Sequence, residues 1–282
     1  MRCVFLIAWV IGFYSCALSA FDVVIPCTEK DLPVLEHAID GIRRHVKGVE
    51  RIFVVSKNHL TDQAEWVPEV SYPFTLEQVG IELFQGDEAA YRAAVEEGFQ
   101  RTGWYFQQLL KLYWPAAHPE GTEYYLVVDA DVVFMRDVSF FYGTTPCYCP
   151  GDEYSVPYFN HMVRLLPGLR RMQRVSGIAH HMLFHRDTLA ALFSQVQDRH
   201  ECPFWKAFLH EVDPEDRSCS GASEYEIYFN YLLLRHTGMK IRPLRWINSG
   251  RLDHMEMHRR RQFDFVSYHD HMQHNQVDGI GF

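Results

Sequence analysis

The length, composition and charge of the chain exclude several classes of protein at the outset. With 282 residues it is long enough for one large domain or two small ones. Apolar residues make up 48% and charged residues 22%, which is typical of a folded globular protein and excludes disorder. The net charge of −9 argues against a nucleic acid as partner, because phosphate backbones require basic surfaces. A single nucleotide stays compatible with this charge, since a bound cation can neutralise it.

Residues 1–20 have the pattern of a secretory signal peptide. Arg2 provides the charged start, residues 3–14 form an apolar segment, and residues 17–20 offer small side chains for cleavage. The apolar segment is short for a membrane span, so we expect a mature chain of residues 21–282 without a transmembrane span. The leader predicts a location in the secretory pathway, either the endomembrane lumen or outside the cell. If the leader is not used, the expected location is the cytoplasm.

A strand, a helix and a second strand are predicted over the first part of the mature chain. Residues 21–27 and 51–56 are apolar, β-branched runs. Between them, Asp31 and Pro33 begin a helix whose apolar residues recur at helical spacing. Strands in such a unit are parallel, and their carboxyl ends share the sheet edge where ligands bind. The candidate nucleotide-binding residues at this edge are Pro26, Thr28, Ser56 and Lys57.

A second amphipathic helix is predicted over residues 102–113, with Pro115 at its end. Gln108 and Lys111 lie within one turn of each other on it. Such side chains are usually exposed, and the functional alternative is that Lys111 points toward a diphosphate. Further predictions are helices over 89–99, 158–169, 186–196 and 204–209, a loop over 142–157, a late strand over 242–247 and a turn over 248–250.

The stretch around Asp129 and Asp131 is the most informative. An apolar run over residues 124–128 predicts a buried strand, and apolar residues resume at Val132 directly after the two acids. Carboxylates this close repel each other, and burying them is costly unless a positive partner is present. Oxygen ligands suit Mn²⁺ or Mg²⁺, which usually carry substrate phosphates as well. We therefore predict that both acids hold a metal ion bound to a nucleotide diphosphate, although Asp-x-Asp alone is more often a solvated turn.

Two acids at the start of a predicted helix are candidates for catalysis. Ser223 follows a run of small residues, and Glu226 comes three residues later. This spacing is typical of a capping box, so a structural role is a strong alternative for Glu226. Glu224 has no such role and could act as general base on an acceptor hydroxyl.

Several histidines accompany these acids. His180 and His181 precede an apolar run, so we expect at least one to face the cleft while the other packs. A core histidine with a satisfied hydrogen bond is the more frequent explanation for either of them. His269 and His271 alternate along an extended segment and point the same way. One of these imidazoles could reach the predicted metal.

Seven segments carry a resemblance to a known family: 22–26, 54–58, 103–113, 128–134, 176–184, 221–228 and 266–269. Through them the chain resembles the GT-A-fold glycosyltransferases over about residues 21–272. It is most similar to a poorly characterised group with bacterial and viral members, often described as a domain of unknown function. The resemblance implies an α/β fold. Residues 21–282 would form a single GT-A-like, Rossmann-related domain with a central mixed sheet flanked by helices.

The resemblance also implies a function and roles for individual residues. It implies metal-dependent transfer of a sugar from a nucleotide-diphosphate donor to a glycan or another hydroxyl acceptor. Mn²⁺ or Mg²⁺ would be held by Asp129 and Asp131, with His269 completing the site, and the base would be Glu224 or Glu226. The candidate donor-binding residues are Pro26, Thr28, Ser56, Lys57, Gln108, Lys111, Asp129, His180 and His181.

Two other functions stay open from the sequence. The stretch around Asp129 also matches the opening motif of haloacid-dehalogenase-type phosphatases, in which the first Asp is the nucleophile. That motif normally begins its domain, whereas here a complete strand-helix-strand unit precedes it. The second alternative is a secreted protein that binds a sugar or a metal in the same cleft without turnover.

Overall fold

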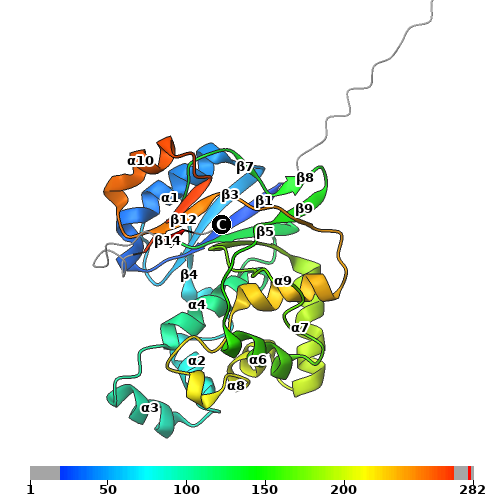
Figure 1. Ribbon diagram of the computed structural model, residues 1–282. Coiled ribbons are helices and arrows are strands. Elements are labelled where there is room, and N and C mark those ends of the chain that lie inside the picture. Colours follow the sequence, from blue (N-terminus) through cyan, green and yellow to red (C-terminus); the bar gives the residue numbers. More distant parts are fainter. Residues whose placement is uncertain (1–19, 270–278, 281–282) are drawn as a thin grey trace, which may run out of the picture.

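Figure 1 shows the computed structural model of the protein, which describes residues 20–269 and 279–280. The predicted leader, up to residue 19, and His271 lie outside these described residues. Within the described part of the chain, no helix combines the length and the apolar character needed to cross a membrane.

A five-stranded mixed sheet lies at the centre of the structure (Figure 1). Its strands are, in spatial order, β10 (His181–His185), β5 (Tyr124–Val128), β1 (Phe21–Pro26), β3 (Val49–Ser56) and β4 (Glu65–Pro68). Strands β1, β3, β4 and β5 run parallel to one another, and β10 runs antiparallel to β5. Helix α1 (Leu32–His45) connects β1 to β3, so the predicted strand-helix-strand unit is confirmed. The carboxyl ends of β1, β3 and β5 therefore share one edge of the sheet.

A second sheet continues from the first at the two acids. Strand β5 ends at Val128 and β6 begins at Val132, so the chain changes sheets across three residues. The second sheet has the order β14 (Gly279–Ile280), β12 (Trp246–Ser249), β13 (Phe265–Tyr268) and β6 (Val132–Phe134). Smaller ladders pair β2 (Val46–Lys47) with β7 (Val138–Ser139), and β9 (Thr145–Tyr148) with β8 (Phe141–Tyr142) and β11 (Lys240–Ile241).

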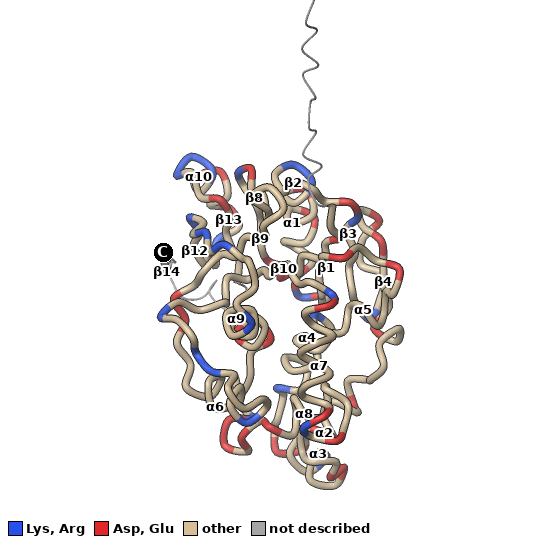
Figure 2. The backbone as a smooth tube through the Cα atoms, turned by 90° about the vertical axis from the view of Figure 1, so that its right-hand side faces the viewer, with Lys and Arg blue, Asp and Glu red and all other residues tan. Residues whose placement is uncertain are grey.

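Helices cover both faces of this arrangement, which confirms the expected α/β fold with a central mixed sheet flanked by helices. Figure 1 shows α1 and α10 on one side of the strands and α4, α6, α7, α8 and α9 on the other. Figure 2 shows acidic and basic residues interspersed along the chain. The remaining helices are α2 (Leu76–Leu83), α3 (Glu88–Glu96), α4 (Thr102–Leu112), α5 (Trp114–Ala117), α6 (Val156–Leu165), α7 (Arg186–His200), α8 (Phe204–His210), α9 (Glu224–Leu234) and α10 (Met255–Arg260).

Some local predictions were wrong. The predicted turn over 248–250 begins inside β12, because Asn248 and Ser249 pair with β13. The predicted loop over 142–157 contains the strand β9, and Pro115 lies in the first turn of α5 instead of ending α4. Asp31 occupies the N-cap position of α1 without capping it, since its carboxylate accepts a hydrogen bond from the Thr28 hydroxyl at 2.9 Å.

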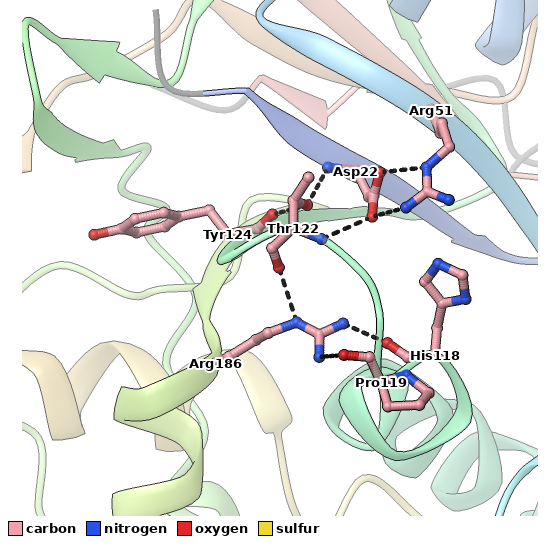
Figure 3. A network of polar contacts seen from close by, with 7 residues as sticks. All are labelled: Asp22, Arg51, His118, Pro119, Thr122, Tyr124 and Arg186. Carbon is pink, nitrogen blue, oxygen red and sulfur yellow. Dashed lines mark hydrogen bonds and ion pairs between the residues drawn. The ribbon is translucent and has the colours of Figure 1, made fainter.

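A buried carboxylate in β1 joins the amino-terminal ends of three strands (Figure 3). Asp22 is fully buried and accepts hydrogen bonds from Nε and Nη2 of Arg51 in β3, at 3.2 and 3.1 Å. The backbone N–H of Thr122 donates to the same carboxylate at 3.1 Å. Arg186, at the start of α7, donates to three carbonyl oxygens of the turn before β5. This network lies at the opposite ends of the strands from Asp129, so we assign it a structural role.

We expect Asp22→Asn to lower the free energy of unfolding by roughly 2–3 kcal/mol, because it leaves the Arg51 guanidinium without its charged partner. This loss is at the low end of what breaking a buried ion pair costs, because the Arg51 side chain is 34% exposed and water can partly replace its partner. Asp40→Asn is the matched control, because Asp40 forms an exposed pair with Arg44, and it should change stability by less than about 0.5 kcal/mol. Chemical denaturation measures both, and equal effects would contradict the assignment.

Helix α6 carries a histidine that is buried in its neutral form. His161 is fully buried and its Nε2 lies 2.8 Å from the carbonyl oxygen of Phe208 in α8. Burial lowers the pKa of His161 to about 4, compared with about 6.5 in an unfolded chain. The unfolded state therefore binds more protons between these two values, and the folded protein loses stability as the pH falls through this window.

The variant His161→Phe should weaken this pH dependence while keeping an aromatic ring in the core. Between about pH 7 and pH 5, the free energy of unfolding should fall less in the variant than in the wild type. Urea denaturation at the two pH values measures the difference, and His37→Gln on the exposed side of α1 is the control. A pH dependence identical in all three proteins would show that His161 is not the titrating group.

Candidate functional site

An open cleft of about 730 Å³ lies at the carboxyl ends of β1 and β3. The four loop residues predicted from the strand ends all line it: Pro26, Thr28, Ser56 and Lys57. Sequence reasoning missed further lining residues, among them Lys30, Asp31, Arg101, Trp104 and Gln107. Three basic side chains (Lys30, Lys57 and Arg101) and three acidic ones (Glu29, Asp31 and Glu69) line the cleft.

One face of α4 forms a wall of this cleft. Gly103, Gln107 and Leu110 line it, and their spacing of four and three residues is that of one helix face. Gln108 lies off this face and is 2% exposed. Its Oε1 accepts a hydrogen bond from the backbone N–H of Glu224 at 3.0 Å. The structure therefore corrects the prediction for Gln108, which supports the start of α9, while Gln107 is the glutamine at the cleft.

Lys111 bridges two acids that are far apart in the sequence. Its Nζ lies 2.7 Å from Oδ1 of Asp129 and 2.7 Å from Oε1 of Glu224. The ammonium also lies 4.4 Å from the centre of the Tyr225 ring, whose hydroxyl donates to Asp129 at 3.1 Å. Lys111 is 4% exposed, so it does not lie on an open helix surface. The buried cation fixes Asp129 relative to α4 and α9.

The charges in this cluster shift one another's pKa values. Burial lowers the pKa of Lys111, but Asp129 and Glu224 outweigh this effect and raise it well above its ordinary value. Burial raises the pKa of Asp129, and Lys111 and His180 reverse the effect, so the net shift is downward. Burial raises the pKa of Glu224 in spite of Lys111. The lysine and Asp129 are therefore a charged pair at neutral pH.

Asp131 faces His269, which follows β13 of the second sheet. Oδ2 of Asp131 lies 2.9 Å from Nδ1 of His269, and Oδ1 accepts a hydrogen bond from the Ser267 hydroxyl at 3.0 Å. The pairing of β13 with β6 brings these residues together, and Nε2 of His269 lies 3.1 Å from Oδ1 of Asn248 in β12. The residues that line the cleft include Cys27 but not Asp131 or His269.

The two adjacent histidines have different surroundings. His180 has a positive φ of 58°, and its Nδ1 lies 3.6 Å from Oδ2 of Asp129. Its ring centre is 5.0 Å from that of His269, so His180 stands between the two acids. His181 is buried among the rings of Phe134, Phe140 and Phe265, which corrects its assignment as a donor-binding residue.

Glu226 is buried away from this cluster. Its carboxylate accepts hydrogen bonds from the Ser176 hydroxyl at 2.5 Å and from Nδ2 of Asn230 at 2.8 Å. The Ser223 hydroxyl accepts from the backbone N–H of Glu226, so only this half of the predicted capping box forms. Glu226 is 1% exposed and thus has a structural role in place of the catalytic one considered from the sequence.

The residues around Asp131 can be compared with the ligands that divalent cations prefer. Among residues 20–269 and 279–280, no three His, Cys, Asp or Glu side chains are grouped so that they could hold a metal ion together. Asp129 bonds to Lys111, and Asp131 and His269 face each other. Mg²⁺, however, is commonly bound by one or two carboxylates, waters and substrate phosphates. Asp131 and His269 offer one carboxylate and one imidazole ligand, which is fewer than a site made of protein groups alone would need.

We expect Lys111→Met to destabilise the protein by roughly 3 kcal/mol, because it leaves the buried Glu224 and the partly buried Asp129 without the ammonium that pairs with both. The double variant Lys111→Met/Glu224→Gln should recover part of this loss, since it removes one of the two charges. Lys206→Met is the control, because Lys206 is 36% exposed in its pair with Glu82, and it should cost about 1 kcal/mol or less. Urea denaturation of all variants tests this, and similar losses for both lysine variants would contradict it.

The amino-acid sequence was also compared with known proteins and protein families. No curated protein matches the chain significantly. A family model described as a family of unknown function, DUF6492, matches residues 21–271, which is nearly the whole described chain. The protein therefore belongs to the DUF6492 family.

Proposed function

We propose that the protein is a metal-dependent, GT-A-like glycosyltransferase that moves a sugar from a nucleotide-diphosphate donor to a hydroxyl acceptor. The observation that carries the proposal is the position of Asp129 and Asp131. They follow β5 at the edge where β1 and β3 open into a cleft, and each is held by a basic side chain, Lys111 or His269. Ligands of open α/β sheets bind at such strand ends.

The cleft offers groups for both ends of a nucleotide-diphosphate sugar. We assign the loops after β1 and β3 to the nucleoside, since Thr28, Ser56 and Asn58 offer polar contacts there. Lys57 and Arg101 line the same cleft and can attract the diphosphate. The volume of about 730 Å³ suits a ligand of this size.

Asp131 and His269 are the residues that would hold Mn²⁺ or Mg²⁺, with Asp129 beside them. When bound there, the ion would neutralise charge that develops on the leaving diphosphate. The Lys111 ammonium pairs with both Asp129 and Glu224. We therefore assign Lys111 the role of positioning Asp129, not that of contacting the donor. His180 stands between the two acids and is placed to orient the diphosphate.

The chemistry constrains where the reaction would take place. Nucleotide-sugar donors are found in the cytoplasm and in endomembrane compartments. If residues 1–20 act as a leader, we propose that the transfer takes place in the endomembrane lumen. If they do not, we propose the cytoplasm.

Purified protein should release nucleoside diphosphate from one of UDP-glucose, UDP-galactose, UDP-N-acetylglucosamine or GDP-mannose when Mn²⁺ is present. We expect chelation to abolish the release, and Asp131→Asn and His269→Ala to reduce it at least about 100-fold, because both remove groups proposed to hold the ion. Asp137→Asn is the control, since Asp137 forms an exposed pair with Lys47.

Other outcomes would separate the alternatives. Undiminished release by a double Asn replacement of Asp129 and Asp131 would contradict the proposal. Release of inorganic phosphate together with a phosphorylated Asp129 would indicate a phosphatase. Calorimetric binding of Mn²⁺ and UDP without any turnover would indicate a binding protein.

A further inference from the structure

The outer face of α6 is apolar although it lies at the surface. The side chains buried on the inner face of this helix are Tyr158, His161, Met162 and Leu165. Val156 and Val163, about two turns apart on the opposite face, are each 51% exposed. Phe159 lies between them and is partly exposed, and Tyr154, just before the helix, is 63% exposed. The helix therefore presents apolar side chains where a surface helix normally has polar ones.

Positive charge follows directly after this helix. The stretch from Tyr154 to Arg186 contains no Asp or Glu, although the whole chain has 36 acidic and 27 basic residues. Arg170, Arg171 and Arg174 lie in this stretch, and Figure 2 shows blue stretches of chain next to α6. None of the ion pairs between described residues includes any of these three arginines. Their charges are therefore available to an external anion.

The arginines and the apolar residues form one continuous surface. The Arg171 guanidinium lies 4.7 Å from the centre of the Tyr154 ring and 5.3 Å from that of Phe159. Its Nη2 also donates to the carbonyl oxygen of Arg174, so the segment 170–174 is held against α6. We call the four outer apolar residues and the three arginines the α6 patch.

Acids limit the α6 patch on two sides. Asp152 and Glu153 come directly before Tyr154 in the chain. On α6 itself, Arg164 lies 3.9 Å from Glu211 and 3.7 Å from Asp213, so its charge is compensated. The uncompensated positive charge is thus concentrated in the segment 170–174, beside the exposed apolar residues.

A bilayer with anionic headgroups matches both parts of the α6 patch. Arginines are attracted to lipid phosphates, and valine and aromatic side chains enter the boundary between headgroups and acyl chains. A convex helix face needs no matching groove in a bilayer, whereas a specific protein partner needs a complementary surface. An acidic polymer would use the arginines but leave the apolar side chains in water.

We propose that the α6 patch docks the protein on the surface of a membrane that contains anionic lipids. The inference goes beyond the proposed function and does not depend on it. Helix α6 would lie along the surface of the bilayer. On its inner side, the ring centre of Tyr158 is 6.5 Å from that of Trp104, which lines the cleft. Docking would therefore bring the cleft to the membrane.

Co-sedimentation with lipid vesicles tests the proposal. Vesicles made of equal parts of phosphatidylcholine and phosphatidylglycerol should bind the purified protein, and more weakly at high salt. Arg170→Gln/Arg171→Gln/Arg174→Gln should weaken this binding about 100-fold, because each basic residue near an anionic surface contributes about a factor of five. Val156→Ser/Val163→Ser should weaken it about tenfold, because the apolar contribution is lost. Vesicles of phosphatidylcholine alone should bind the wild type about as weakly as anionic vesicles bind the triple variant.

Arg259→Gln/Arg260→Gln/Arg261→Gln is the matched control. It removes the same number of arginines at α10, on the other side of the strands (Figure 1), where Glu256 pairs with Arg259 and Arg260. This control should bind anionic vesicles as the wild type does, and all variants should keep the thermal unfolding temperature of the wild type. If the triple variant in the α6 patch is less stable, Arg170→Gln/Arg174→Gln changes only exposed side chains and should still weaken binding about 25-fold.

Several outcomes would overturn the proposal. These are equal binding to both kinds of vesicle, no binding to either, or an equal loss in the α10 control. Binding to polyglutamate but not to vesicles would identify an acidic macromolecule as the occupant and would also overturn it. Each of these outcomes leaves the proposed function standing, because diphosphate release is measured without vesicles and does not involve the α6 patch.

Discussion

The ion pairs of Lys111 are the interaction on which the geometry of the site depends. The Lys111 ammonium and the Glu224 carboxylate are almost fully removed from water, and the Asp129 side chain is 21% exposed. Buried charges of this kind cost several kcal/mol each unless they stay in contact. Since Lys111 comes from α4, Asp129 follows β5 and Glu224 begins α9, this requirement fixes three elements relative to one another. The hydroxyl of Tyr125 in β5 adds a hydrogen bond to the Lys111 carbonyl oxygen at 3.2 Å. The rim of the sheet and the helices that face it therefore form one rigid frame.

The central sheet could be predicted from the sequence, but the second sheet could not. Strands β1, β3 and β5 each contain a short apolar run, and a strand-helix-strand unit leaves little choice of pairing. The second sheet instead joins Phe134 to Phe265, positions separated by more than a hundred residues that no local pattern connects. Asn248 and Ser249 precede a glycine and have the composition of a turn, yet pairing with β13 outweighs that local preference and makes them a strand.

The same limit explains which site residues could be predicted. Pro26 and Ser56 reach the cleft because parallel strands end at one edge, a rule that needs no side-chain detail. Whether a helical residue reaches the cleft depends on the direction in which its side chain points. Neighbouring side chains on a helix differ by about 100° in direction, so Gln107 lines the cleft while Gln108 lies in the core. Burial of Lys111 follows from partners 18 and 113 positions away in the chain, which composition does not reveal.

The connection between β5 and β6 explains why two acids, and not one, stand at this position. Asp129 bonds to the helical side of the protein through Lys111 and Tyr225, and Asp131 bonds to the second sheet through Ser267 and His269. A single acid could not join both halves, and a longer connection would let them move apart. His180 lies beside both carboxylates, so they stay within one polar region although their partners differ. Because Asp129 is paired with the buried Lys111, Asp131 is the carboxylate to which we assign the proposed cation.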